Sequence, residues 1–320
     1  MERAFDILGL LSSRSFRSGQ SIAEKLGITR AAVWRQIVRL KQVGVEIQGI
    51  SGKGYRLEAA FEPLCADVIS GSLKEIGCDG YDSIKVVKVV DSTNAEILRA
   101  NSQSGQKALF AEYQIAGKGR RNDKWISPPG AGICFSIGWR CEQPQSSFSA
   151  LGLVVGVALI DALRKLGVTD LKLKWPNDVV SNDLKMAGIL IDLQSEVSGP
   201  CFAVIGIGLN IRLGKVARST IDKEVTDLES VSGRYFTRNE VAFALLSELD
   251  GYLKVFSKQG FKPFRAAWSK YDSLLARKIK IELGNKTIVG RAEGVDQSGA
   301  LLVRHDGRLE QFLSGHISML

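Results

Sequence analysis

The sequence predicts an α/β protein of the α+β type, with three domains in a chain of 320 residues. Three features carry this prediction: a basic N-terminal segment of helices and a hairpin, a central region of alternating strands and helices, and a C-terminal stretch without helical periodicity. We expect a winged helix-turn-helix over residues 1–62, a mixed β-sheet domain over 63–271, and an SH3-like β-barrel over 272–320. The length suits this division, because a domain usually holds about 100–200 residues.

The pattern of residues 1–60 predicts three helices and a hairpin. The second helix is expected to begin at Ser21, with Glu24 completing a capping box, and to end at Gly27, which can adopt a left-handed conformation. Thr29 is the expected N-cap of the third helix. Helix, tight turn and helix, followed by a hairpin with a basic tip, is the order of a winged helix-turn-helix.

This segment is also strongly basic. It holds ten Lys or Arg against five Asp or Glu, so +5 of the net charge of +9 lies in under a fifth of the chain. A basic small domain suits the phosphate backbone of a nucleic acid, and the exposed face of a third helix can address base edges. The alternative is a small helical interaction module with solvated charges. The predicted DNA-binding residues are Ser21, Thr29, Arg30, Trp34, Arg35 and Lys53.

The central region alternates apolar strand patterns with helical ones. Strands are expected at 84–90, 109–113, 132–139, 171–175, 187–194 and 202–209, and helices at 94–100, 148–166 and 238–258. Several strands follow one another directly, which favours a mixed, largely antiparallel sheet with helices on one side over a doubly wound sheet. Pro63 and a turn near Gly71 are expected to mark the entry to this domain.

The short alternating runs after residue 272 are separated by Gly-Asn, Gln-Ser-Gly and Asp-Gly turns. Such runs predict a small barrel of the SH3-like type.

Composition argues against several classes of function. No apolar run reaches the roughly 18–20 residues of a membrane span, and the N-terminus lacks a signal-peptide pattern, so we expect a cytoplasmic protein without a membrane partner. Five scattered cysteines form no Cys-x-x-Cys pair, which argues against a disulfide framework or a zinc site. The two histidines, His305 and His316, lie near the C-terminus. A histidine-based nucleophilic mechanism therefore has little material.

Three polar segments stand out in the central region. The run Lys174-Trp175-Pro176-Asn177-Asp178 must end a strand, because Pro176 removes a backbone donor and restricts its predecessor; Lys185 follows in a hairpin. The loop 117–125 combines glycines with four cationic side chains, as a polyphosphate or acyl-adenylate site requires. Asp91-Ser92-Thr93-Asn94 joins a strand to a helix. Alone, each has an ordinary structural explanation: a solvated lysine, a surface loop or an N-cap.

In this order and at these separations, the segments resemble the biotin protein ligase family. The N-terminal sixty residues further resemble its bifunctional subgroup that doubles as the biotin operon repressor, the BirA type. The resemblance implies a catalytic domain of the biotin/lipoate ligase type, which uses ATP and Mg²⁺ to convert biotin to biotinyl-5′-AMP. A lysine of the biotin carboxyl carrier domain of acetyl-CoA carboxylase then accepts the biotin. The adenylate would also be the corepressor, implying a homodimer on operator DNA when it is bound.

The resemblance assigns site residues by position. Catalytic roles fall to Lys185, Arg120, Lys174 and Asp178. Biotin contacts fall to Ser92, Thr93, Asn94, Gln114, Gly117, Lys118, Gly119, Arg120, Lys185, Gly188 and Gly206. ATP and adenylate contacts fall to Arg121, Lys124, Trp125, Lys174, Asn177 and Asn210. Mg²⁺ is expected to arrive with ATP, without a site fixed by protein ligands alone.

The loop departs from the family's usual Gly-Arg-Gly-Arg-x-Gly-Arg-x-Trp. Lys118 cannot make a paired guanidinium contact, and Asp123 puts a carboxylate beside the phosphates, so we expect faster escape of the adenylate and weaker corepression. Asn122 replaces a glycine and tolerates left-handed geometry. The alternatives are a monofunctional ligase with a non-repressing N-terminal module, a biotin-sensing transcription factor without transferase activity, and a lipoate ligase.

Overall fold

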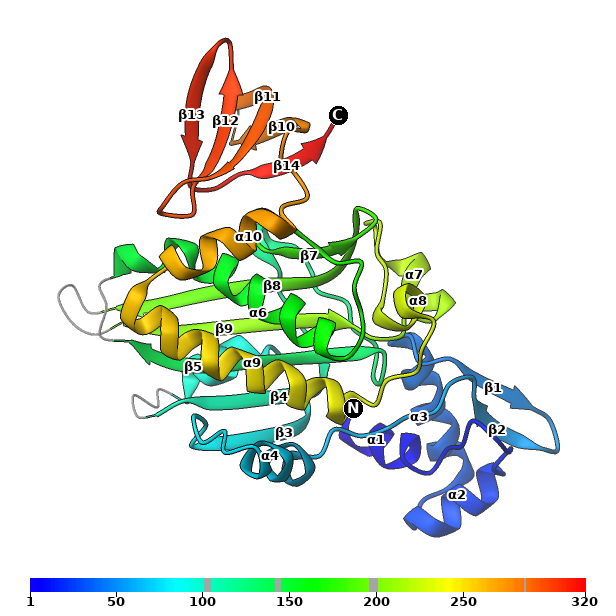
Figure 1. Cartoon of the computed structure of the whole chain (residues 1–320). Helices are drawn as coiled ribbons and strands as arrows, with labels where there is room; N and C mark the ends of the chain where they lie inside the picture. The colour runs from blue at the N-terminus through cyan, green and yellow to red at the C-terminus, as the bar shows by residue number, and fades with distance from the viewer. Residues whose placement is uncertain (101–104, 142–144, 196–200, 285) are drawn as a thin grey trace.

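The computed structural model describes residues 1–100, 105–141, 145–195, 201–284 and 286–320. Figure 1 shows a large central sheet, with a small helical domain against one side of it and a separate C-terminal sheet at another. A two-stranded, a seven-stranded and a five-stranded sheet fall within the three predicted domains in that order. The mixed α/β class is confirmed.

The N-terminal domain consists of α1 (Glu2–Leu8), α2 (Gly19–Leu26), α3 (Arg30–Gln42) and the hairpin β1 (Ile47–Ile50) and β2 (Gly54–Leu57). Thr29 caps α3 as predicted, with its hydroxyl accepting from the backbone N–H of Ala32 at 3.2 Å. The predicted cap of α2 is wrong. Ser18 accepts from the N–H of Ser21 at 3.0 Å, so the helix begins earlier and Ser21 lies inside its first turn.

The central sheet has the order β3-β4-β5-β9-β8-β7-β6. Its strands are β3 (Ser83–Val90), β4 (Lys107–Gln114), β5 (Gly132–Cys141), β6 (Lys172–Lys174), β7 (Asp178–Ser181), β8 (Leu184–Ser195) and β9 (Cys201–Asn210). Only the β3–β4 pair among these neighbours is parallel, which confirms a mixed, largely antiparallel sheet.

Helices cover both faces of this sheet, so the predicted one-sided cover is wrong. The main core packs alternate strand residues such as Phe110 and Ile205 against α4 (Ala66–Glu75), α6 (Leu151–Lys165), α9 (Arg238–Gln259) and α10 (Arg265–Tyr271). The helix α5 (Thr93–Arg99) lies on the other face, where its Ile97 packs with Leu109 and Val204. The expected turn near Gly71 is also wrong, because Gly71 lies within α4.

The C-terminal sheet has the order β13-β12-β11-β10-β14 and is antiparallel throughout. Its strands are β10 (Lys278–Leu283), β11 (Lys286–Val295), β12 (Leu301–His305), β13 (Arg308–Phe312) and β14 (His316–Met319). The SH3-like barrel stays a prediction. Among the described residues, no helix is long and apolar enough to cross a membrane.

Candidate active site

Glycines on β8 and β9 form the floor of the candidate site, on the face of the sheet that carries α5. Gly188 lies opposite Gly208 and Leu190 opposite Gly206 in adjacent strands. From Gly206 to Asn210 the strand advances about 13 Å, at roughly 3.3 Å per residue. The floor is therefore long enough for an elongated ligand.

Three side chains lie directly on this floor. A Cβ at Gly206 would lie 2.2 Å from Asn94 Oδ1, and one at Gly208 would lie 2.3 Å from Trp125 Cε2. A Cβ at Gly188 would lie 3.1 Å from Lys185 Nζ. These glycines thus make room for protein side chains on the floor of the cavity, which Gly188 and Gly206 also line. Their predicted contacts with biotin stay a prediction.

A cavity of about 530 Å³ lies over the floor. Of the predicted catalytic, biotin and ATP residues, those that line it are Thr93, Asn94, Gln114, Lys118, Gly119, Arg120, Arg121, Lys124, Trp125, Lys174, Asn177, Asp178, Lys185, Gly188, Gly206 and Asn210. Two others lie elsewhere. Ser92 is buried at the start of α5. Gly117 lines a neighbouring cavity and packs against the backbone of Trp125, whose carbonyl oxygen would lie 2.6 Å from a Cβ at this position.

One end of the cavity has a neutral, hydrogen-bonded wall. Gln114 Oε1 accepts from the backbone N–H of Thr93 at 2.8 Å, and Asn94 Nδ2 donates to Asp192 Oδ2 at 2.7 Å. Behind them, Ser136 Oγ lies 2.6 Å from Thr93 Oγ1 and 2.5 Å from Asn94 Oδ1. The sequence prediction missed Ser136 and Asp192. Each is a single polar residue within an apolar strand run, and that isolation is the signal by which the sequence could have identified it.

Lys185 lies at the middle of the cavity and is paired. Its Nζ is 2.6 Å from Asp178 Oδ1 and 5.8 Å from the centre of the Trp125 ring. The hairpin of β7 and β8 brings Lys185 beside the last residue of the Lys-Trp-Pro-Asn-Asp run, so Lys185 is not the solvated surface lysine of the ordinary explanation. An anionic ligand would have to compete with Asp178 for this lysine.

The cationic loop closes the other side. The backbones of its two arms pair in an isolated antiparallel β-bridge between Lys118 and Lys124. The N–H of Gly119 also donates to the carbonyl of Asp123 at 2.7 Å. Burial and the neighbouring Arg121 lower the pKa of Arg120, while Asp178 acts in the opposite direction. A half-buried guanidinium beside a second cation would gain from an anion in the cavity.

Asp123 has a cationic partner that the sequence did not predict. Its carboxylate forms an ion pair with Lys223, so its charge is balanced by a cation rather than left to repel phosphate. The positive φ of this loop lies at Arg121, which has φ 55° and donates to the carbonyl of Glu282 in β10 at 3.2 Å. The side chain of Asn122 lies outside the described residues.

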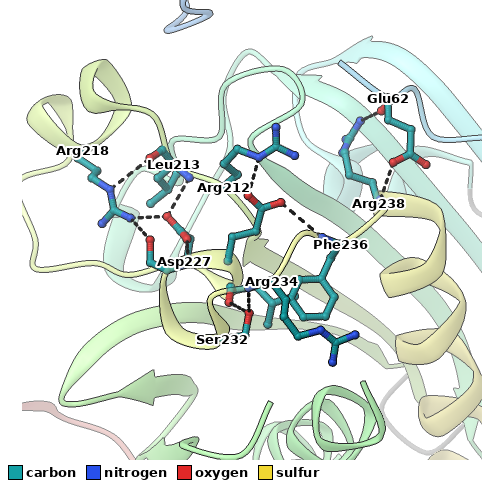
Figure 2. A network of polar contacts seen from close by, with 12 residues as sticks. Glu62, Arg212, Leu213, Arg218, Asp227, Ser232, Arg234, Phe236 and Arg238 are labelled. Carbon is teal, nitrogen blue, oxygen red and sulfur yellow. Dashed lines mark hydrogen bonds and ion pairs between the residues drawn. The ribbon is translucent and has the colours of Figure 1, made fainter. Parts of the chain in front are cut away.

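Lys223 belongs to a strap, residues 213–227, that contains α7 (Lys215–Thr220) and crosses the cavity. The strap pairs with β8, where the N–H of Lys185 donates to the carbonyl of Glu224 at 3.1 Å. Figure 2 shows its base, where Asp227 accepts from the N–H of Leu213 at 2.9 Å and pairs with Arg218. The strap therefore reaches both the central lysine and the cationic loop.

Two predicted nucleotide-binding asparagines tie these parts together. Asn177 Nδ2 donates to the carbonyl of Ile189 at 2.9 Å, and Asn210 Nδ2 donates to the carbonyl of Thr226 at 3.1 Å. Both amide nitrogens thus donate to backbone carbonyls, so the amide oxygens of these side chains remain available to a ligand.

The predicted DNA-binding residues lie together on the N-terminal domain, away from this cavity. All six are exposed, and Trp34 is 58% exposed on α3. The domain also packs on the central one, where Lys88 of β3 pairs with Asp6 at 2.7 Å and Glu46 accepts from the N–H of Val216 in the strap at 3.0 Å.

Three family models match successive parts of the chain. They are an HTH domain over residues 3–56, the biotin/lipoate A/B protein ligase family over 86–210, and the biotin protein ligase C-terminal domain over 276–320. The bifunctional ligase/repressor BirA of Escherichia coli (strain K12) is 37% identical over 98% of this chain and 96% of its own length. The Bacillus subtilis protein of that name is 28% identical over 98% of each chain.

The chain is also similar to the biotin–[acetyl-CoA-carboxylase] ligase of Mycobacterium tuberculosis, 33% identical over 74% of this chain and 89% of that one. A solved structure of the Aquifex aeolicus biotin protein ligase in complex with biotin and ATP superposes with a TM-score of 0.65, at 28% identity, over 75% of this chain and 99% of that chain. The chain therefore belongs to the biotin protein ligase family, in its bifunctional ligase/repressor group. This confirms the family predicted from the sequence.

Proposed function

We propose that the protein is an ATP-dependent ligase that attaches biotin to a biotin carboxyl carrier domain through biotinyl-5′-AMP, and that it represses biotin synthesis genes when biotin is available. One observation carries the ligase assignment: a cavity of about 530 Å³ joins a neutral hydrogen-bonding wall, a central lysine and a cationic loop. Biotin has a matching sequence of groups, with a neutral ureido ring at one end and a carboxylate at the other. The nucleotide would lie beyond that carboxylate.

In the first step the biotin carboxylate attacks the α-phosphorus of ATP and pyrophosphate leaves. Lys185 would leave Asp178 to hold the carboxyl oxygen, while Arg120 and Lys174 balance phosphate charge. Placement of two reactants and fixed cationic groups can provide this catalysis without a protein nucleophile. Mg²⁺ bound to ATP would neutralise further phosphate charge. The carboxylates of Asp178 and Asp183 in the cavity lining are oxygen ligands of the type that Mg²⁺ prefers.

In the second step the ε-amine of the acceptor lysine attacks the acyl carbon and AMP leaves. The rim near the central lysine includes residues of β14, such as His316 and Ser318, so an acceptor domain entering here would also meet the C-terminal domain. Asp178 lies beside Lys185 and would orient the incoming amine. Domain boundaries after residues 62 and 271 are part of this proposal.

The repressor role rests on the exposed basic face of α3 and the wing. Arg30 and Arg35 would contact phosphates, and Trp34 would face the major groove. The adenylate would act as corepressor by ordering the loop and the strap, which favours a homodimer on operator DNA. A cytoplasmic location stays a prediction.

Transfer of labelled biotin to a purified carrier domain, followed by operator binding with the same preparation, tests both roles. We expect transfer that requires ATP and Mg²⁺, and a shift of the protein's own biotin-synthesis promoter that requires biotin and ATP. Transfer without any promoter shift would leave the monofunctional ligase. A shift without transfer would leave a biotin sensor.

A further inference from the structure

A chain of hydrogen bonds runs behind the neutral end of the cavity and ends at a carboxylate. Asp192 accepts from Asn94 Nδ2, Asn94 Oδ1 lies 2.5 Å from Ser136 Oγ, and Ser136 Oγ lies 2.6 Å from Thr93 Oγ1. Thr93 and Asn94 line the cavity, whereas Ser136, which is 0% exposed, and Asp192 lie behind it. Neither Ser136 nor Asp192 has a role in the ligation chemistry described above.

Two acceptor-only groups orient the Asn94 amide: Asp192 Oδ2 at 2.7 Å from Asn94 Nδ2, and the backbone carbonyl of Leu190 at a longer 3.4 Å. The shorter contact, to a charged carboxylate, is the stronger of the two. A carboxylate only accepts, so it turns the nitrogen of the Asn94 amide toward Asp192 and the oxygen toward Ser136. An amide oxygen has no hydrogen to give, so the hydroxyl hydrogen of Ser136 points to Asn94. Because a hydroxyl has one hydrogen, the contact between Ser136 and Thr93 takes its hydrogen from Thr93.

The result is a fixed pattern on the cavity wall. Thr93 Oγ1 has two acceptors in reach, Ser136 Oγ at 2.6 Å and Gln114 Oε1 at 3.1 Å, and the shorter contact takes its hydrogen. Its oxygen is left with a lone pair for a ligand. Gln114 Oε1 is held by the backbone N–H of Thr93, so the Gln114 Nε2 group is left to donate.

We propose that Asp192 and Ser136 are positioning residues that fix this polarity, so that the wall offers an acceptor at Thr93 beside a donor at Gln114. A cyclic urea is the complementary ligand, because its N–H donors flank a carbonyl acceptor. A ring without N–H groups, such as the dithiolane of lipoate, would leave the Thr93 acceptor unpaired in a buried site, and such sites reject the ligand that lacks the group. The inference rests on the proposed function, since it takes biotin as the occupant.

The test is Asp192→Asn, which keeps the shape but can turn either an oxygen or a nitrogen toward Asn94. With only the long contact to the Leu190 carbonyl left to favour that polarity, we expect the KM for biotin in adenylate formation to rise about tenfold, while the KM for ATP and kcat stay within about twofold. Asp192→Glu, which is again acceptor-only, should recover part of the loss. Ser136→Ala should raise the same KM, and the double variant should be no worse than the poorer single one, because both interrupt one chain.

Glu293→Gln is the matched control, because that exposed carboxylate pairs with Arg304 in the C-terminal sheet and should leave all constants unchanged. If Asp192→Asn lowers the Tm, the ratio of KM for N-methylated biotin to KM for biotin is measured within each protein, since it is independent of the folded fraction. We expect the variant to discriminate less than the wild type. An equal ratio, or an unchanged KM for biotin, overturns the inference. A wild-type protein that releases no pyrophosphate with biotin and ATP would overturn the proposed function itself.

Discussion

The two ends of the cavity are held by different interactions. At the neutral end, Thr93, Asn94 and Ser136 are at most 5% exposed and hydrogen-bonded to one another. At the loop end, Asp123 and Lys223 form an ion pair with side chains 53% and 51% exposed. A buried polar network is costly to disrupt, whereas an exposed pair contributes about 0.2–1 kcal/mol and is screened by salt. We infer that the neutral end selects the ligand and that the loop end sets how long the adenylate stays.

The largest expected effect lies between these two ends, at Lys185. Lys185→Ala removes the cation next to the reacting carboxyl oxygen and leaves the Asp178 carboxylate unbalanced near the phosphates. Loss of one such group costs on the order of 10²–10³ in kcat, about 3–4 kcal/mol. Steady-state pyrophosphate release measures this.

The control for this variant is Lys262→Ala, an exposed lysine remote from the cavity lining. The melting temperature should match the wild type for both. More than half of wild-type transfer by Lys185→Ala would remove this lysine from the mechanism.

Substitutions of two glycines on β9 test more directly whether the two ends of the cavity act independently. Gly206→Ala would push a methyl group against Asn94, and Gly208→Ala would push one against the Trp125 ring. Overpacking of this kind costs about 1–3 kcal/mol. We expect Gly206→Ala to raise the KM for biotin more than tenfold, roughly the effect of 1.4 kcal/mol. Gly208→Ala should instead raise the KM for ATP.

Initial rates with each substrate varied give the four constants. Equal effects of both glycine variants on both substrates would mean that the ends are not separate.

Much of this organisation was predictable from the sequence. The strands and the order of the three domains follow from apolar alternation and turn signals. Nearly all of the ligand-binding residues that the family resemblance assigned do line the cavity, but much of the remaining lining, such as Lys223 and His316, was not predicted. The cap of α2 failed because Ser18 and Ser21 are both good N-caps, and local sequence does not choose between them. The predicted one-sided cover failed at α5 because helical periodicity does not indicate which side of a sheet a helix covers.

The contacts that the sequence did not predict share one cause. Asp123 and Lys223 are 100 residues apart, and Asn94 and Asp192 are 98 apart. Such pairs depend on the register of β8 and on the course of the strap, which a single sequence does not specify. The side chains that Gly206 and Gly208 accommodate, Asn94 and Trp125, were not predictable for the same reason, because what a missing Cβ accommodates is set by distant residues.

An exposed cationic surface on α3 adds a third region to the comparison. Arg35→Ala should weaken operator binding several-fold and reduce the slope of log affinity against log salt by about 0.9, the value of one phosphate contact. Ligation should be unchanged, because Arg35 is exposed on a separate domain. Titrations of operator DNA at four salt concentrations measure the slope. An unaltered slope and affinity would mean that α3 is not the recognition helix.

The smallest expected effect is at the exposed pair. Asp123→Asn or Lys223→Gln should speed the release of biotinyl-AMP by about 1.4- to 5-fold, the equivalent of 0.2–1 kcal/mol, because either change frees the loop from the strap. The double variant should release the adenylate no faster than the faster single one, and the effect should fade at 0.5 M salt because the pair is screened, with a Debye length of roughly 3–8 Å there. Lys118→Arg should act in the opposite direction, since a guanidinium can make paired contacts to phosphate. Stopped-flow release from the four variants and the wild type measures these rates. Release that is slower in Asp123→Asn would restore the repulsion that the sequence alone suggested, and would show that the pair with Lys223 does not hold the loop.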